Sequence, residues 1–480
     1  MAEPLRFPDI PIYQGWGAPN RVESEIRDLE ITHGAIPADL TGRLLRCGPD
    51  RQYPPMTGDD IFIDGEGMVH CFTFRDGHVD YRSRWIRNER FLLQEAARRS
   101  LFGRYRNRYT NDPSVKGKNQ GAANTNVIWH GRKMLVLKEE VLPVEVDPEF
   151  FFVEGDWDFH GKVQSKSLTA HPKIDPNTNE LIMFSYQAKG DATTDFVFYT
   201  IGPDGHVEHE IPFQMPYAAM VHDFAITDTH LIVPFFPLIS DMKTIKAGGP
   251  YYEWHPDRQC HVAIVPRRGS SDQIRWFSGP ACSAGHMMNA FNEGDLLHLD
   301  LCLYEGNCFP FFPAADGSAH VPCPPLLTRM TFDLGGSDDS FTNTMLGPRP
   351  QPCEMPQIDE RFVGKPYRFG FTICFEAPRR TSFLGKWDMH TGEMTRWHPG
   401  EDSAIQEPKF VPRGPGEGNG YLLIPINRLA ENRSDLAILD AQDIGKGPIC
   451  IAKLPLRLRA SFHGSWVPEE SFRTGLYNYP

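Results

Sequence analysis

Short β-strands joined by tight polar turns recur along almost the whole 480-residue chain, and this pattern restricts the fold more than any other feature. The segment FTFRDGHVDYRSRW, residues 72–85, is an example, because an Asp-Gly turn separates two stretches of high β-propensity. The same strand–turn–strand arrangement is found in residues 170–186, 199–213, 385–399 and 436–455. Good helical spacing of apolar residues occurs over one long stretch, residues 88–107, where we expect a helix.

The number of hairpins favours a β-propeller, in which small antiparallel sheets are arranged around a ring. A sandwich cannot absorb so many hairpins, whereas a propeller adds them blade by blade. The blades do not repeat in sequence, so the pattern alone does not give their number. The longest irregular tract, residues 304–325, is typical of a loop and not of a domain boundary. We therefore expect an all-β fold with a single domain over residues 1–480.

Charge and composition exclude several classes of function. The net charge is 49 − 62 = −13, which argues against a nucleic-acid partner. The N-terminal residues contain no signal sequence, and the most apolar stretch, residues 231–239, is too short to span a bilayer, so we expect no membrane anchor. The ten cysteines form no C-x-x-C pair, which is typical of reduced thiols in a cytoplasmic protein. Nucleotide-binding glycine motifs do not occur.

Four of the 18 histidines lie within or at the end of apolar, strand-like runs, next to a small residue or a tight turn. They are His171, His222, His286 and His463. Each alone is also typical of a hydrogen-bonded core histidine. In a propeller, however, the inner strands converge on one axis, so four blades could each supply an imidazole to one iron, copper or zinc ion. Ligating imidazoles usually donate their second N–H to a carboxylate, so buried glutamates are expected as well. Asp223, beside His222 in the apolar run 220–226, also needs a partner if it is buried.

These four motifs, in this order, resemble those of the carotenoid cleavage oxygenases, and the resemblance extends from about residue 27 to residue 466. It implies a seven-bladed β-propeller with a small helical and loop cap over an axial metal site. It also implies that Fe(2+) is held by the four histidines named above, and that three glutamates orient their rings: Glu139, Glu354 and Glu407. Thr125, in GAANTNV, matches a threonine whose methyl group crowds one iron coordination position.

Residues 100–117 and 121–140 are similar to the branch of this family that cleaves phenolic alkenes, the lignostilbene dioxygenase and isoeugenol monooxygenase type. On that resemblance Tyr105 and Lys138 hold the 4-hydroxyl of the substrate. An ammonium beside a phenol lowers the pKa of the phenol, and phenolate character makes the conjugated alkene more reactive toward O2. Neighbouring strand residues point to opposite faces, so Lys138 and Glu139 can both face the site only at a bulge or a strand end.

The substrate itself is left open between alternatives. Stilbene-cleaving relatives carry an aromatic residue at the position of Ile63, which here leaves room without a stacking partner. This favours small phenylpropenoids such as isoeugenol or 4-vinylguaiacol, cleaved with O2 to aromatic aldehydes such as vanillin. Stilbenoid cleavage and apocarotenoid cleavage are the alternatives within the family, and a ligand-binding propeller without chemistry is the alternative outside it. The reaction needs no external reductant, because the alkene supplies the electrons. A homodimer is one oligomeric state that the sequence leaves open.

Overall fold

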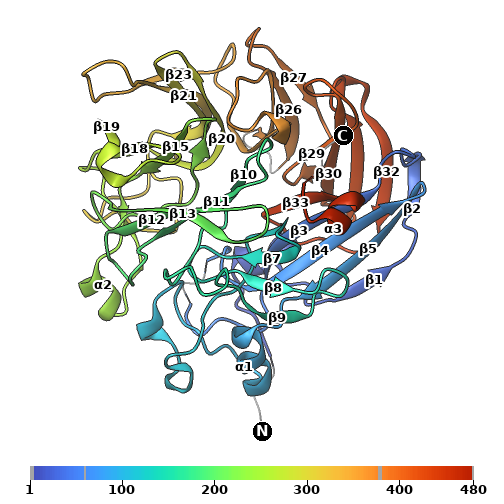
Figure 1. Ribbon diagram of the computed structural model, residues 1–480. Coiled ribbons are helices and arrows are strands. Elements are labelled where there is room, and N and C mark those ends of the chain that lie inside the picture. The colour runs from blue at the N-terminus through green and yellow to red at the C-terminus, as the bar shows by residue number, and fades with distance from the viewer. Residues whose placement is uncertain (1–4, 59–60, 377–380, 478–480) are drawn as a thin grey trace.

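The computed structural model describes residues 5–58, 61–376 and 381–477, and these form a seven-bladed β-propeller (Figure 1). Each blade is an antiparallel sheet whose strands follow one another from the axis outward. The first blade contains β33 (His463–Pro468), β3 (Gly42–Asp50), β4 (Glu66–Arg75), β5 (His78–Trp85) and β1 (Ser24–Ile26). The second contains β6 (Asn126–His130), β7 (Lys133–Leu137), β8 (Val144–Val146) and β9 (Val153–Asp156). The third contains β10 (Lys173–Ile174), β11 (Leu181–Tyr186), β12 (Asp195–Ile201) and β13 (Val207–Gln214).

The remaining four blades follow in chain order. The fourth contains β14 (Ala225–Ile226), β15 (His230–Phe235), β18 (Cys260–Pro266) and β19 (Arg275–Gly279), beside the separate pair β16 (Leu238–Ile239) and β17 (Glu253–Trp254). The fifth contains β20 (Ser283–Glu293), β21 (Leu296–Tyr304), β22 (Leu326–Asp333) and β23 (Thr342–Met345). The sixth contains β24 (Cys353–Ile358), β25 (Phe369–Phe375), β26 (Ser382–Asp388) and β27 (Met394–Trp397). The seventh contains β28 (Ser403–Ile405), β29 (Lys409–Pro412), β30 (Gly420–Arg428), β31 (Arg433–Asp440), β32 (Pro448–Leu454) and β2 (Glu30–Gly34).

All five hairpins expected from the sequence are confirmed by strand pairing. The pairs are β4–β5, β10–β11, β12–β13, β26–β27 and β31–β32. The turns form where the sequence places Gly, Asn or Asp, since these residues tolerate the backbone conformations that tight turns require. The tract 304–325 is irregular over most of its length, as predicted.

The ring is closed by strands from both ends of the chain. β33 pairs with β3 on the inner side of the first blade, and β2 pairs with β32 on the outer side of the seventh. In Figure 1 the blue N-terminal strands therefore lie beside the red C-terminal strands. Closing a ring through paired strands leaves neither the first nor the last blade with an open face.

The hydrophobic core is divided among the contacts between neighbouring blades. The fourth and fifth blades, for example, share one cluster of fully buried side chains that includes Ile232, Val262, Leu297 and Leu299. Because each sheet is covered on both faces, the central strands are apolar almost continuously, as in β11, where every residue is buried. This arrangement fixes the inner strands, and it is these strands that carry the site.

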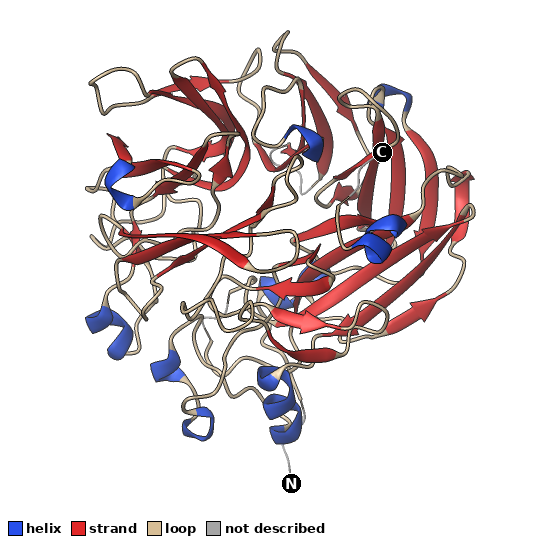
Figure 2. Cartoon of the chain, in the orientation of Figure 1, coloured by secondary structure: helices blue, strands red, loops and turns tan. Residues whose placement is uncertain are grey.

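The helices are few, short and outside the sheets (Figure 2). They are α1 (Glu89–Ala97), α2 (Met242–Lys246) and α3 (Glu469–Thr474), with 3-10 turns at Pro11–Tyr13, Gly15–Gly17, Arg108–Thr110, Pro113–Val115, Ser271–Gln273, Glu360–Phe362 and Ile444–Lys446. The expected helix over residues 88–107 is wrong in extent. It stops at Ala97 because Arg98 adopts a left-handed conformation, with φ 53°, at the C-cap. The residues after it form a loop, which is what brings Tyr105 to the site.

A cap covers one end of the propeller axis. The loop after α1 is joined to the α2 region, since the Asn107 side-chain amide donates to the carbonyls of Ile245 and Gly249, at 2.9 Å and 2.7 Å. The ring of Tyr105 packs on that of Phe312, with centroids 5.9 Å apart, which adds the 304–325 loop to the cap. Three chain segments that are distant in sequence thus lie together over the site.

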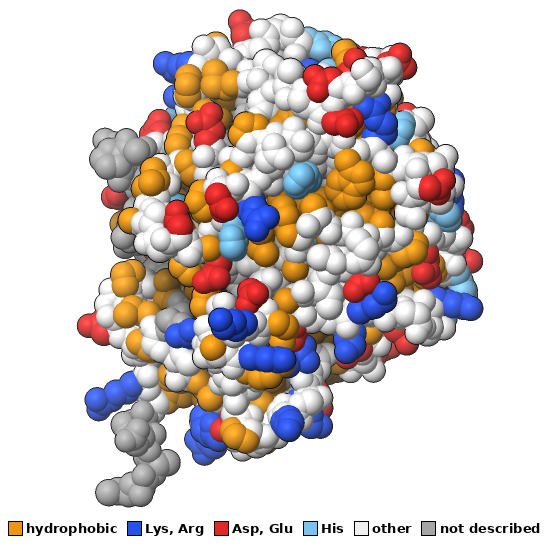
Figure 3. Space-filling view, turned by 90° about the vertical axis from the view of Figure 1, so that its left-hand side faces the viewer, with side chains coloured by type: hydrophobic (Ala, Val, Ile, Leu, Met, Phe, Trp, Pro, Cys, Tyr) orange, Lys and Arg blue, Asp and Glu red, His pale blue; other side chains and the backbone are white. Residues whose placement is uncertain are grey.

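On the face shown in Figure 3, acidic and basic side chains are interspersed, and the hydrophobic ones lie among them in small groups. The ten cysteines are all free thiols. Among the described residues, no helix has both the length and the apolar character needed to cross a membrane.

Candidate active site

Every blade carries one polar residue of the predicted set at its inner edge, either within the innermost strand or in the few residues before it. In blade order these residues are His463, Thr125, His171, His222, His286, Glu354 and Glu407. All seven are buried or nearly so. A ring of seven blades therefore gathers residues that lie hundreds of positions apart.

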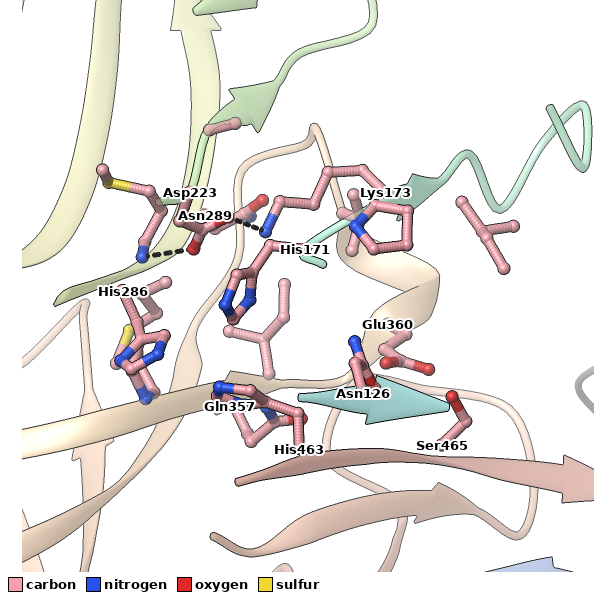
Figure 4. A pocket seen from close by; sticks show the side chains of 18 of the residues that line it. Asn126, His171, Lys173, Asp223, His286, Asn289, Gln357, Glu360, His463 and Ser465 are labelled. Carbon is pink, nitrogen blue, oxygen red and sulfur yellow. Dashed lines mark hydrogen bonds and ion pairs between the residues drawn. The ribbon is translucent and has the colours of Figure 1, made fainter. Parts of the chain in front are cut away.

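The four histidines meet at one point. One ring nitrogen from each lies within 4.8 Å of the others, and the Nε2 atoms of His171 and His222 are 3.1 Å apart. Figure 4 shows His171, His286 and His463 converging from three different blades. The buried Nε2 of His286 has no hydrogen-bond partner among the residues the structure describes. Four convergent imidazole nitrogens, one of them otherwise unsatisfied, fit a single first-row metal ion.

Three of the imidazoles are oriented by the three predicted glutamates. The Nδ1–H groups of His222, His286 and His463 donate to carboxylate oxygens at 3.0, 2.7 and 2.8 Å, and the acceptors are Glu139, Glu354 and Glu407 respectively. A carboxylate can only accept, so Nδ1 carries the proton and Nε2 keeps its lone pair for the centre. His171 has no such partner among the described residues.

Burial and the neighbouring groups set the charge of the rings. Burial, together with the three other imidazoles, lowers the pKa of His171 well below its usual value. Burial also lowers the pKa of His463 to about 4, although the carboxylate of Glu407 opposes this. Both rings are therefore neutral at physiological pH and able to ligate a metal. For His286 the effect of burial is outweighed by Glu354, which raises the pKa of the ring.

Two β-bulges orient one of these pairs, His286 and Glu354. The register of β20 shifts between Ala284 and Met287, and that of β24 shifts between Glu354 and Gln357. The extra residue at each bulge interrupts the regular alternation of side chains, so that His286 and Glu354 face the axis. A side chain at Gly285 would displace the carboxylate of Glu354, because a Cβ atom there would lie 2.5 Å from Oε1 of Glu354.

The carboxylate of Glu407 is held by a buried arginine at the closure of the ring; we call this the closure corner, formed by Arg46, Glu407 and His463. The guanidinium of Arg46 donates to Oε2 of Glu407 at 2.7 Å, and the two side chains are 1% and 3% exposed. Arg46 also donates to the carbonyl of Phe462 at 3.1 Å. Burial tends to raise the pKa of Glu407, but His463 and Arg46 lower it to about 2. This carboxylate is charged and fixed on both sides.

The carboxylate of Glu139 is held differently, by neutral phenols; we call this the pocket corner, formed by Glu139, His222, Tyr105 and Tyr186. Its Oε1 accepts from Tyr105 at 3.2 Å and from Tyr186 at 3.1 Å, while Oε2 accepts from His222. The nearest guanidinium, that of Arg106, lies farther away, with Nη1 at 3.8 Å from Oε1. Burial tends to raise the pKa of Glu139, but His222, Arg106 and Lys138 together lower it to about 2.

The ammonium of Lys138 is buried close to Tyr105. β7 ends at Leu137, so Lys138 and Glu139 lie beyond the strand and are not forced to opposite faces. The ammonium is 5.3 Å from the centroid of the Tyr105 ring. Within the described part of the chain its one hydrogen bond is a long contact of 3.5 Å to the carbonyl of Ile63. A buried ammonium with three donors and one weak acceptor is able to bind an anionic oxygen.

A row of aromatic rings leads from the histidines to the surface. The ring of Phe309 lies 5.6 Å from that of His222, that of Phe311 lies 5.7 Å from Phe309, and that of Phe62 lies 5.9 Å from Phe311. Phe62 is 46% exposed. The sequence predicts a loop at 304–325, and the Phe-Pro-Phe-Phe run within it is the signal that an apolar lining is present.

On the other side of the histidines lies a polar cavity of about 160 Å³ (Figure 4). Its lining comes from the inner strand of every blade, so it lies on the propeller axis. His171, His286 and His463 reach it, whereas His222, Tyr105 and Lys138 do not line it. A polar cavity of this size has room for several water molecules. The histidine cluster therefore borders a polar cavity through three of its rings and the row of aromatic rings through His222.

Asp223, which the sequence leaves without an assigned partner, ties three blades together. Its Oδ1 accepts from Lys173 at 2.7 Å, and its Oδ2 accepts from the backbone N–H of Met287 at 2.8 Å. The carboxylate thus joins the third, fourth and fifth blades beside three of the four histidines. Thr125, at the start of the second inner strand, is 6% exposed, and its hydroxyl donates to the side chain of Asn124 at 3.0 Å.

Comparisons with known proteins agree with one another. The family described as "Retinal pigment epithelial membrane protein" matches residues 17–468. Isoeugenol monooxygenase of Pseudomonas nitroreducens is 44% identical over 467 residues, which cover 94% of this chain and 96% of that protein. Lignostilbene-alpha,beta-dioxygenase isozyme III of Sphingomonas paucimobilis is 39% identical over 483 residues, covering 96% and 98%. The crystal structure of Pseudomonas brassicacearum lignostilbene dioxygenase superposes with a TM-score of 0.93, at 42% identity, over 97% of this chain and 100% of that one.

Proposed function

The chain belongs to the retinal pigment epithelial membrane protein (RPE65) family, the carotenoid cleavage oxygenases, and from this premise we propose its substrate class. It is an alkene-cleaving dioxygenase, and we propose that it splits the exocyclic C=C bond of 4-hydroxyphenyl alkenes. One O2 is consumed for each alkene, the C=C and O–O bonds break, and two C=O bonds form. With isoeugenol the products are vanillin and acetaldehyde. No other reductant enters this balance.

The observation that carries the proposal is the buried ammonium of Lys138 beside Tyr105. The carboxylates of Asp64, Glu139 and Glu140 balance its charge electrostatically, but its hydrogen bond to the carbonyl of Ile63, at 3.5 Å, is weak and leaves donors for a further oxygen. A 4-hydroxyl bound between Lys138 and Tyr105 would supply that oxygen as a phenolate. The negative charge is delocalised into the conjugated alkene, which becomes easier to oxidise.

We propose that His171, His222, His286 and His463 hold Fe(2+), which supplies the activation of O2 when it is bound. The convergent Nε2 atoms and the three oriented Nδ1–H groups support this assignment. The protein's own residues do the rest. Lys138 and Tyr105 place the phenol at one end of the aromatic pocket, so that the side-chain alkene extends toward the histidines. The cap, with Phe309 against His222, limits the access of water to the reacting bond.

The side chain of Ile63 supports a small phenylpropenoid over a stilbene. It is aliphatic and partly buried against the cluster that contains Tyr105 and Phe312. Isoleucine offers no flat surface on which a ring can stack. The first ring and its hydroxyl therefore have a defined site, whereas the group beyond the alkene has none at this position.

A stilbenoid substrate is the second candidate, and a specific observation favours it. The rings of Phe309, Phe311 and Phe62 follow one another from the histidines to the surface. A second aryl ring beyond the alkene could pack on them. The same Lys138 and Tyr105 would hold its 4-hydroxyl.

The test combines one substitution with two substrates. In Lys138→Met, the turnover of isoeugenol should fall about 10–1000-fold, because a charge-assisted hydrogen bond and the phenolate character are both lost. Isoeugenol 4-O-methyl ether should be a poor substrate for the native protein and be little affected by the substitution. Lys133→Met is the matched control, since Lys133 begins β7, the strand that leads to Lys138, but pairs with Glu145.

The outcomes separate the hypotheses. If the native protein cleaves the methyl ether as fast as the free phenol, Lys138 does not select the hydroxyl and the proposal is wrong. Faster cleavage of resveratrol than of isoeugenol would favour the stilbenoid candidate. Cleavage of a long apocarotenal alone would overturn both. A chain that retains no iron after anaerobic reconstitution would be a binding protein and not an oxygenase.

A further inference from the structure

The pocket corner contains more hydrogen-bond donors than Glu139 needs. Oε1 of Glu139 accepts from two phenols, Tyr105 at 3.2 Å and Tyr186 at 3.1 Å. A tyrosine hydroxyl has a single proton to donate. If Tyr105 turns that proton to a bound substrate phenolate, as the proposed function requires, it can no longer donate to Glu139. The second phenol then becomes the remaining support for this oxygen.

The proton of Tyr186 is directed toward Glu139 by its neighbours. The guanidinium of Arg106 donates to the hydroxyl oxygens of both Tyr186 and Tyr252, the latter at 2.7 Å. These two hydroxyls are themselves 3.1 Å apart. An arginine side chain donates and never accepts, so the phenolic protons cannot point back toward it. The hydroxyl of Tyr252 therefore donates to that of Tyr186, and the hydroxyl of Tyr186 donates to Glu139.

We infer that Arg106, Tyr252 and Tyr186 form a clamp that holds the carboxylate of Glu139, and through it the ring of His222, in place when Tyr105 is engaged by substrate. These three are positioning residues, which act on the site through Glu139. The inference rests on the proposed function for one step, the engagement of Tyr105 by a phenol. The clamp itself consists of contacts that are present without a ligand.

The construction of the clamp supports this role. Arg106 is 8% exposed and adopts a left-handed backbone conformation with φ 58°, which a non-glycine residue does not take without support from its surroundings. Its guanidinium lies against three tyrosine rings, with 5.2 Å to the centroid of Tyr186, 4.8 Å to Tyr251 and 5.6 Å to Tyr252. Cation–π contacts of this kind fix the plane of the guanidinium and so the direction of its donors.

Tyr251 offers a matched control within the same cluster. Its ring contacts the same guanidinium and is 2% exposed. Its hydroxyl, however, points away from the site, and its one proton has two acceptors within reach, the side-chain oxygens of Gln187 at 2.8 Å and Asp191 at 3.0 Å. Removing this hydroxyl changes the cluster without changing the support of Glu139.

The experiment measures how fast iron is lost from anaerobic, iron-loaded protein to a ferrous chelator. Each rate is measured with and without saturating dihydroisoeugenol, a phenol that lacks the side-chain double bond and is not cleaved. In the native protein and in Tyr251→Phe, the phenol should not accelerate the loss. In Tyr186→Phe, we expect the phenol to accelerate it about 10-fold, the usual scale for losing an outer partner of a metal ligand. In Tyr105→Phe, the phenol should have no such effect, because Tyr186 still supports Glu139.

A double variant tests the clamp without any ligand. Tyr105→Phe combined with Tyr186→Phe should lose iron about 10-fold faster than either single variant in the absence of phenol, since Oε1 of Glu139 then has no donor. Thermal unfolding of each iron-free variant, compared with Tyr251→Phe, reports on folding separately.

Two results would overturn the inference. One is an iron-loss rate for Tyr186→Phe that stays at the native value while the phenol is bound. The other is a double variant that holds iron as firmly as the native protein. If titration shows that dihydroisoeugenol does not bind the native protein, the proposed function fails, and the double variant alone then decides whether the clamp exists.

Discussion

The closure corner and the pocket corner hold equivalent carboxylates by different means. At the closure corner Glu407 is bonded directly to Arg46 at 2.7 Å, inside the paired strands that join the two ends of the ring. At the pocket corner Glu139 is bonded to two phenols, and the nearest guanidinium nitrogen is 3.8 Å away. Both carboxylates nevertheless accept from an imidazole of the same cluster.

The difference shows where the molecule needs a rigid contact and where a donor needs to exchange one hydrogen-bond acceptor for another. An ion pair buried on both sides cannot give up a partner without leaving a charge unsatisfied. A phenol can turn its proton from one acceptor to another at a lower cost, because it is neutral. The direct ion pair lies where the fold must stay closed, and the phenols lie where we propose that substrate binds.

The largest effect should come from removing an imidazole, and there the two corners should behave alike. His222→Ala and His463→Ala should each lose iron and at least about 10³-fold of activity, since each removes a quarter of the proposed donor set. Iron content and turnover of purified protein measure this. His209→Ala, a control on β13 whose ring contacts the carbonyl of Gly269, should leave both unchanged. Full iron content in either variant would remove that histidine from the site.

The second effect separates the corners. Arg46→Met leaves Glu407 as a buried charge without its guanidinium, which should lower the free energy of unfolding by about 3–5 kcal/mol. Arg106→Met should cost less, about 1–3 kcal/mol, because its hydrogen bonds go to neutral hydroxyls and its ion pairs with Glu139 and Glu140 are longer, at 3.8 and 3.9 Å. Urea denaturation of the iron-free proteins gives both values. Equal losses would contradict the distinction between the corners.

The third effect concerns Glu354, whose carboxylate accepts from the backbone N–H of Met355 at 2.8 Å and adds to the effect of burial in raising the pKa of the neighbouring Tyr304 phenol, with no arginine paired to it among the described residues. Glu354→Gln should weaken iron binding about 10–100-fold while some turnover remains, because an amide can still accept from His286 but without charge. Competition with a chelator of known affinity measures it. Unchanged retention of iron would show that the charge at this position has no influence on the metal.

The smallest effect tests the pocket corner alone. Ile63→Phe should shift the ratio of kcat/KM for resveratrol to that for isoeugenol about 2–10-fold toward resveratrol, the scale of one aromatic stacking contact. Iron content should not change, because an aliphatic side chain can neither bind a metal nor form a hydrogen bond with the histidines or glutamates. A shift in the opposite direction would show that Ile63 does not border the far end of the substrate.

Local patterns in the sequence predict the blades but not the closure of the ring. A turn such as Asp76-Gly77 is encoded within a few residues, so each hairpin could be read separately. The pairing of β33 with β3 joins residues more than 400 positions apart and has no local signal. The helix expected at 88–107 ends early for a related reason. The residues that follow Ala97 contact the α2 region and Phe312, which are distant in sequence, and these contacts outweigh the local helical spacing of apolar residues.

The same limit applies to the site. The histidines and glutamates stand out because polar residues in apolar runs need a reason to be there. Arg46 and Arg106 do not stand out, because a buried arginine and a surface arginine look alike in a sequence. In a regular strand Lys138 and Glu139 would point to opposite faces, and the sequence does not show that β7 ends at Leu137. Partners that are supplied by distant strands become visible only when the ring is assembled.

The strand that closes the ring also carries His463, and this sets the order of events during synthesis. His171, His222 and His286 emerge from the ribosome long before β33 does, and until then they can offer a metal three ligands at most. The complete site forms when β33 inserts beside β3, in the same step that closes the propeller. Metal binding by all four histidines would therefore require translation of β33, and bound metal should stabilise the closed ring rather than nucleate its folding.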